Sequence, residues 1–117
     1  MRVAIVGSRT LTISNLGDYL PPDTTEIISG GARGIDACAR AYAQAHGIKL
    51  VEHKPNYSRY LGGAPKIRNE RIIAEADLVL AFWDGQSRGT AYVIKKCRSI
   101  GKPVKIFVEN KKEKADA

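Results

Sequence analysis

Residues 29–36 read Ser-Gly-Gly-Ala-Arg-Gly-Ile-Asp, with three glycines in five positions, between a strand pattern and a helix pattern. Glycines let a backbone turn tightly and approach a ligand closely. Free N–H groups at a helix N-terminus favour an anion, and Arg33 could add a charge-assisted contact to phosphate. The run therefore predicts a phosphate-bearing ligand at a strand-to-helix turn, bound through Ser29, Gly30, Gly31, Arg33 and Gly34.

The alternative for this run is a tight turn with a purely structural role. Its spacing, Gly-Gly-x-x-Gly, is not the dinucleotide-binding pattern, and the Lys-Ser/Thr ending of a P-loop is absent. Asp36 is interpreted as a first-turn carboxylate that complements the helix dipole rather than as a catalytic group.

Three other segments carry candidate ligand-binding residues. Gly7, Ser8 and Arg9 follow the first strand pattern, and an ordinary turn with a solvated arginine is the alternative there. A mid-helix asparagine is a poor helix former, which favours a ligand-facing role for Asn69 or its neighbour Arg68. The third segment closes the expected cleft and offers a second anion-binding helix start. Its candidates are Asp84, Ser87, Gly89 and Thr90.

Several residues in or near these segments each have a structural interpretation beside the ligand-binding one. Thr90 could be only an N-cap, and Trp83 could either pack in the core or stack on a base. Tyr57 and Tyr60 flank Arg59, an arrangement that a single-strand binder would use. The same tyrosines could instead fold over the sheet.

Strand and helix patterns alternate along the chain, which positions these segments. Strands are expected at residues 2–6, 25–29, 48–53, 78–83 and 103–108. Helices are expected at 33–46, 64–76 and 90–100, with a short one within 10–20 that Ser14 or Asn15 caps, and 54–63 is expected to be a loop. This alternation predicts an α/β fold: one three-layer, Rossmann-like domain with a five-stranded parallel sheet in the order 3-2-1-4-5. Ligands of such sheets bind beyond the carboxyl ends of the strands, at the switch point.

Length and composition set the class of protein. The 117 residues are 44% hydrophobic and 26% charged, as in a globular chain, and predict one domain at 1–108 with a charged, flexible tail at 109–117. No apolar run is long enough to span a bilayer, and the N-terminus is strand-like, so we expect a cytoplasmic protein without a membrane partner. The net charge of +7 favours an anionic partner, a nucleotide or a nucleic acid, although three lysines of the tail contribute to it.

Cysteine and histidine usage predicts no redox or metal site. Cys38 and Cys97 fall on the apolar stripes of expected helices, which is typical of small buried side chains. His46 and His53 lie on different elements without metal-ligand spacing. We therefore expect neither a metal nor a cofactor.

The motifs at 6–9, 29–36, 68–69 and 87–90, with Ile72-Ile73, resemble the SLOG superfamily over residues 1 to about 108. This superfamily includes the DNA-processing protein DprA, the LOG phosphoribohydrolases and small stand-alone YspA/YpsA-like domains, which the segment from Phe82 to Thr90 resembles most. The resemblance implies a Rossmann-like domain that binds nucleotides, nucleotide-derived ligands or nucleic acid. It carries a ligand role to Gly7, Ser8, Arg9, Ser29, Gly30, Gly31, Arg33, Arg68, Asn69, Gly89 and Thr90.

One departure from the resemblance bears on catalysis. LOG enzymes carry a Pro-Gly-Gly-x-Gly-Thr-x-x-Glu run whose Glu takes part in N-glycosidic cleavage, and Val93 stands at that position here. The leading hypothesis is therefore a nucleotide-binding module, a sensor or a part of nucleotide metabolism. The alternatives are a phosphoribohydrolase-like N-glycosidase with Asp84 as its carboxylate, and a DprA-like binder of single-stranded DNA. Related domains often pair, so a homo-oligomer is also expected.

Overall fold

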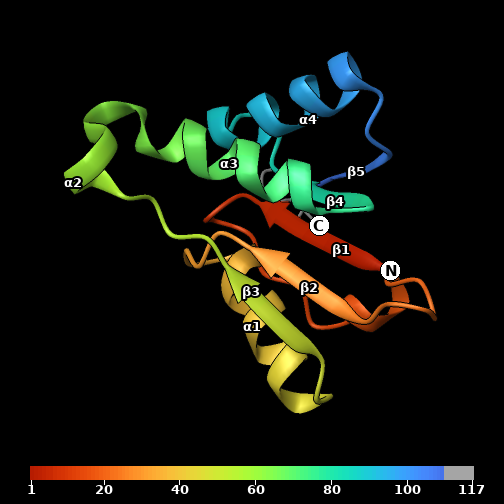
Figure 1. The fold of residues 1–117 in the computed structure, drawn as a ribbon. Coiled ribbons are helices and arrows are strands. Elements are labelled where there is room, and N and C mark those ends of the chain that lie inside the picture. Colours follow the sequence, from red (N-terminus) through yellow and green to blue (C-terminus); the bar gives the residue numbers. More distant parts are fainter. Residues whose placement is uncertain (110–117) are drawn as a thin grey trace.

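The protein forms a five-stranded parallel sheet in the order β3-β2-β1-β4-β5, seen in a computed structural model that describes residues 1–109 (Figure 1). All four strand pairs are parallel. The predicted α/β class and strand order are confirmed. The strands are β1 (Arg2–Gly7), β2 (Glu26–Ser29), β3 (Lys49–Glu52), β4 (Leu78–Trp83) and β5 (Val104–Val108).

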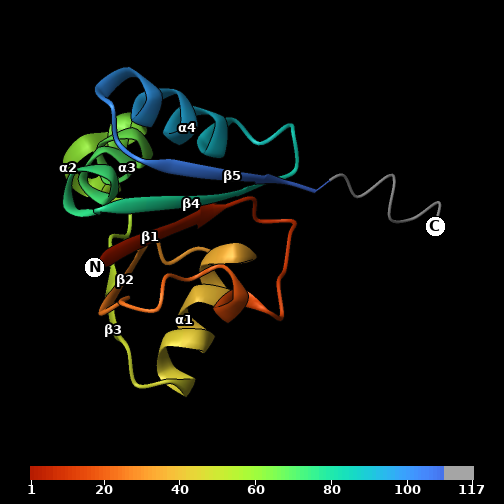
Figure 2. The same cartoon turned by 90° about the vertical axis from the view of Figure 1, so that its right-hand side faces the viewer.

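Helices cover both faces of the sheet and complete three layers (Figures 1 and 2). Helix α1 (Ile35–Ala45) and the 3₁₀ turn η1 (Leu16–Asp18) pack on one face, while α3 (Ala64–Glu75) and α4 (Arg88–Ile100) pack together on the other. The chain crosses from β3 to α3 through the short helix α2 (Tyr57–Tyr60) and the 3₁₀ turn η2 (Leu61–Gly63). In Figure 1 these two elements project beyond the sheet.

Two apolar clusters make up the core, one on each face of the sheet. Alternation along β1 divides its side chains, because successive residues of a strand point to opposite faces. Val3 and Ile5 join the cluster beneath α1, whereas Ala4 and Val6 join the cluster beneath α3 and α4. The two cysteines are free: Cys97 is buried in the second cluster, and Cys38 is half-buried on α1.

Most element bounds differ from the predicted ones by one or two residues, and three local features differ in kind. Helix α4 begins at Arg88 with Ser87 as its N-cap, so Thr90 lies inside the helix and is not the cap. The expected loop at 54–63 contains α2 and η2, since the Asn56 side chain accepts a hydrogen bond from the Arg59 N–H and nucleates a turn. Asn15 precedes η1, but its amide bonds to the Asp18 carboxylate instead of capping the turn.

The described residues include only the start of the tail predicted at 109–117. The Glu109 N–H donates to the Trp83 carbonyl, 2.8 Å away, and so extends the pairing of β5 with β4. Residues 110–117 lie outside the described part of the chain. Within residues 1–109, no helix has both the length and the apolar character needed to cross a bilayer.

Candidate functional site

A cavity of about 340 Å³ lies at the carboxyl ends of β1, β2 and β4, between the N-termini of α1 and α4. This is the switch point of the sheet, because the chain order runs outward from β1 in both directions. The volume falls within the range of small-molecule sites. Ten of the fourteen predicted ligand residues line the cavity: Gly7, Arg9, Gly30, Arg33, Arg68, Asn69, Asp84, Ser87, Gly89 and Thr90.

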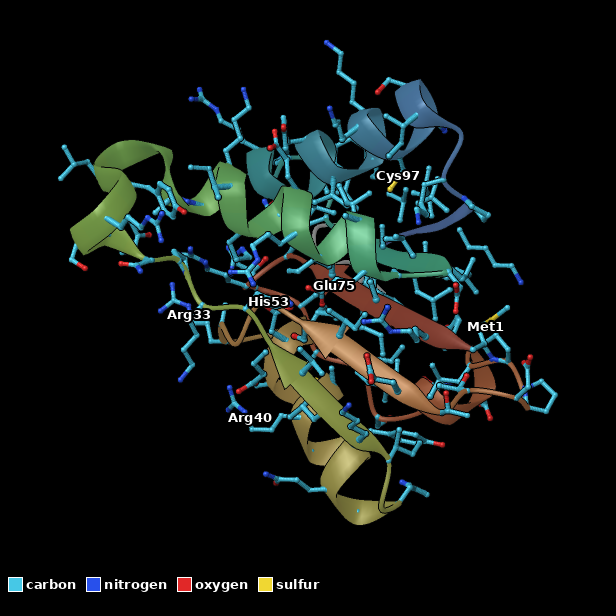
Figure 3. The ribbon with its side chains drawn as sticks, viewed as in Figure 1. Met1, Arg33, Arg40, His53, Glu75 and Cys97 are labelled. Atoms are coloured by element: carbon cyan, nitrogen blue, oxygen red, sulfur yellow. The ribbon has the colours of Figure 1, made fainter. Side chains whose placement is uncertain are left out.

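Three polar side chains of the lining have no partner within the described residues. Arg9 and Arg33 form neither a hydrogen bond nor an ion pair there, and both are exposed. Arg33 lies at the edge where the strands end (Figure 3). The Asn69 amide forms no hydrogen bond either, although the residue is only 9% exposed. Because buried amides are ordinarily hydrogen-bonded, Asn69 has unused donor and acceptor capacity directed at the cavity.

Arg68 is the most enclosed cation of the site. Its Nη1 donates to the Gly30 carbonyl at 2.9 Å and to the His53 carbonyl at 3.4 Å. Its Nε is buried and has no partner. Burial lowers the pKa of Arg68 below the usual arginine value, although the nearby Asp36 carboxylate opposes this shift. A side chain at residue 30 would collide with Nη1, so glycine there lets the guanidinium reach the loop.

Asp36 also lines the cavity, near Arg68. The sequence had not indicated that this residue belongs to the ligand site. Its Oδ2 accepts a hydrogen bond from the Ala32 N–H at 3.1 Å. Burial raises the pKa of the Asp36 carboxyl above its usual range, while the Ala32 N–H and the Arg68 charge limit that rise. Asp36 therefore braces the glycine loop from the first turn of α1 and also presents a carboxyl group to the cavity.

Asp84 holds the turn that leads into α4. Its Oδ1 accepts hydrogen bonds from the backbone N–H groups of Gln86 and Ser87, at 2.8 and 2.7 Å, and its Oδ2 accepts one from Thr10 Oγ1. These bonds keep the pKa of Asp84 below the usual aspartate value. An ionised carboxylate already occupied in this way is a poor proton donor.

Four predicted residues do not line the cavity: Ser8, Ser29, Gly31 and Gly34. Ser8 connects the loops, because its Oγ accepts from the Asp84 N–H and its carbonyl accepts from the Ile35 N–H. Gly34 has φ +72°, and a Cβ there would lie 2.5 Å from the Arg9 carbonyl oxygen. These positions allow α1 to begin against the backbone of residues 8–9. Ser29 is fully buried at the end of β2.

One wall of the cavity is apolar. It is formed by Val6 of β1, Ile72 of α3 and Val93 of α4. Val93 stands where the LOG-like run would carry its carboxylate, so no acid faces the cavity from that turn of α4. Asp84 lines the cavity as a carboxylate already bonded to the turn, and the N-glycosidase alternative through Asp84 stays a prediction.

The histidines lie away from this cavity. His53 Nε2 is 2.7 Å from Glu75 Oε1, and Figure 3 shows the two side chains meeting between the end of β3 and α3. His46 Nδ1 lies 3.0 Å from the Tyr42 carbonyl at the end of α1. Across residues 1–109, no three His, Cys, Asp or Glu residues are grouped to hold a metal ion.

The fold and the position of the cavity define the class of this chain as a Rossmann-like domain with a polar cleft at its switch point. Within that class the chain belongs to the YspA, cpYpsA-related SLOG family, whose model matches residues 1–60. The family broadly suggests nucleotide-related binding or metabolism.

The chain is also similar to the Gene 61 protein of Mycobacterium phage D29. The two are 33% identical over 116 residues, covering 88% of this chain and 93% of that protein. No solved structure gives a significant match.

Proposed function

We propose that the chain binds a nucleotide or nucleotide-derived ligand through its phosphate groups, in the cavity between α1 and α4. One observation carries the proposal: the unpartnered cations Arg9 and Arg33 meet the N-termini of two helices around a single cavity. The first N–H groups of a helix have no acceptor within the helix and favour anions.

The charges of the lining support an anionic ligand. Arg9, Arg33 and Arg68 provide three guanidinium groups against the carboxyl groups of Asp36 and Asp84. Asn69 is placed to accept and donate hydrogen bonds to the ligand.

Ligand-dependent stabilisation tests the proposal. We expect one member of a panel of nucleotides, cyclic dinucleotides, ADP-ribose species and short single strands to raise the melting temperature. At a hundred times its Kd, a ligand adds about 2.7 kcal/mol to the free energy of unfolding. The Arg33→Ala variant should lose the response, because it removes an unpartnered cation of the cavity.

Arg71→Ala is the matched control. Arg71 is exposed on α3, makes no hydrogen bond or ion pair within the described residues and does not line the cavity. Its variant should respond as the unchanged protein does. If both variants lose the response equally, the effect is one of net charge and the proposed site is wrong. A single-strand ligand whose binding weakens steeply with salt would instead support the nucleic-acid alternative.

A further inference from the structure

A second cavity, also of about 340 Å³, lies at the carboxyl ends of β4 and β5 on the α1 face of the sheet. Residues 11–15 border it together with the aromatic side chains of Tyr19, Phe82 and Phe107. The first cavity, at the carboxyl ends of β1, β2 and β4, includes no aromatic residue in its lining. The two cavities therefore differ in chemistry: three arginines line the first, whereas three aromatic side chains and Glu109 are in the lining of the second.

The aromatic side chains form one packed group. The Tyr19 ring meets Phe107 edge-on with centroids 4.7 Å apart, and Phe82 stacks against Phe107 at 5.1 Å. Phe82 is buried, whereas Tyr19 and Phe107 are half-buried, and all three side chains line the cavity. Flat apolar ring surface beside water is what a nucleobase uses for stacking.

The rim of the second cavity adds polar groups. Thr12 and Ser14 are exposed, and their hydroxyls make no hydrogen bond within the described residues. Hydroxyl groups can either donate or accept, so they suit the mixed edge of a base.

The two cavities adjoin at the segment that follows β1. Gly7 and Thr10 line the first, whereas the adjoining Leu11 lines the second. A Cβ at Gly7 would lie 2.5 Å from the Ile35 side chain, and Ile35 lines the second cavity. Arg9 and Thr10 are exposed and lie between the two cavities, and we call this pair of residues the crest.

We infer that the second cavity is a nucleobase subsite: a nucleoside diphosphate places its phosphates in the first cavity, crosses the crest at Arg9–Thr10 and stacks its base beside Tyr19 and Phe107. This inference rests on the proposed function, because the phosphate site anchors the ligand. It explains how a nucleotide could be recognised by a chain whose phosphate cavity offers nothing for a base to stack on.

Calorimetric titration with ADP, GDP, CDP, UDP and pyrophosphate tests the subsite. At least one nucleoside diphosphate should bind the unchanged chain more tightly than pyrophosphate. Tyr19→Leu removes a ring and should weaken that nucleoside diphosphate about tenfold, a typical effect of losing one stacked base. Its pyrophosphate affinity should remain unchanged, which also verifies that the variant is folded.

Tyr42→Leu is the matched control, since Tyr42 packs against the same core cluster but lies outside the second cavity. The inference is overturned if no nucleoside diphosphate binds more tightly than pyrophosphate, or if Tyr42→Leu weakens the nucleotide as much as Tyr19→Leu does. It is also overturned if Tyr19→Leu weakens pyrophosphate equally. In these cases pyrophosphate binding still supports the phosphate site, whereas failure of every probe to bind the unchanged chain overturns the proposed function as well.

Discussion

The two aspartates of the first cavity show how local contacts can shift the pKa values of one residue type in opposite directions. Asp84 accepts backbone N–H groups and a threonine hydroxyl, and these bonds favour its charged form. Asp36 is mostly enclosed, and burial disfavours its charged form despite the neighbouring Arg68. The pKa values of the two carboxyl groups therefore move in opposite directions beside a single cavity. Asp84 serves as an acceptor for the turn, whereas Asp36 bonds to the glycine loop close to Arg68.

The lowered pKa of Asp84 predicts a pH-dependent contribution to stability. Asp84→Ala should reduce the free energy of unfolding by about 1 kcal/mol at pH 7, as the loss of a capping side chain does. A group whose pKa is lower in the folded state contributes stability above its unfolded pKa and loses it as the pH falls through the folded value. The difference between variant and unchanged protein should therefore shrink below pH 3.8, the ordinary aspartate value. Urea unfolding at pH 7 down to pH 2 measures it.

Asp23→Ala provides the control for this pH series. The Asp23 side chain is exposed and makes no hydrogen bond within the described residues, so its removal should have little effect at any pH. A constant deficit of Asp84→Ala from pH 7 to pH 2 would show that the charge of Asp84 does not hold the turn.

Among the helical elements, the α2–η2 segment (Tyr57–Gly63) differs from the others in its exposure. None of its residues is buried, and Leu61 is 73% exposed with a positive φ of 51°. A positive φ is uncommon for a residue other than glycine. Its tyrosines do not line either of the cavities described above, so their aromatic surface remains outside the proposed ligand path.

Limited proteolysis should cut this segment first. Proteases act on exposed segments that open at little cost in free energy. We expect the first chymotryptic cleavage after Tyr57, Tyr60 or Leu61, identified by mass spectrometry of the early fragments. Changing all three residues to alanine should delay cleavage while leaving the melting temperature almost unchanged, because their side chains are exposed. An earlier cut at the buried Phe82, or at the half-buried Tyr19 that packs against the core, would contradict this prediction.

The sequence predicted the elements well because its patterns are strong where burial is complete. The nearly continuous apolar run of β4 and the stripe of α4 leave few alternatives. Helix α2 was missed because four exposed residues carry no apolar period. The site was predicted at the level of loops, since glycine marks where a backbone must turn. Side-chain direction within a loop has no such marker. Sequence alone therefore could not separate Ser8, which connects the loops, from Arg9, which faces the cavity.

At the scale of the whole molecule, strand β1 joins the two core clusters on opposite faces of the sheet. Its alternating side chains enter both core clusters, and its carboxyl end leads into the wall between the two cavities. The neighbouring strand β2 repeats this arrangement, with Ile27 in one cluster and Ile28 in the other, both fully buried. Because the same backbone supports both clusters, neither can lose its packing without disturbing the other.

This arrangement predicts that the two clusters unfold in one cooperative transition. Ile27→Val and Ile28→Val remove one methylene group from opposite faces, and each should lower the free energy of unfolding by about 1 kcal/mol. Both should leave the denaturant m-value unchanged, since the surface exposed on unfolding is the same. Ile100→Val, at a side chain that is 53% exposed, should change stability by less than about 0.5 kcal/mol.

Urea unfolding followed by circular dichroism and by Trp83 fluorescence makes the comparison. Trp83 packs against the cluster beneath α3 and α4, so fluorescence should coincide with circular dichroism in both valine variants. If Ile28→Val shifts the fluorescence transition alone, the clusters are independent units and β1 does not couple them.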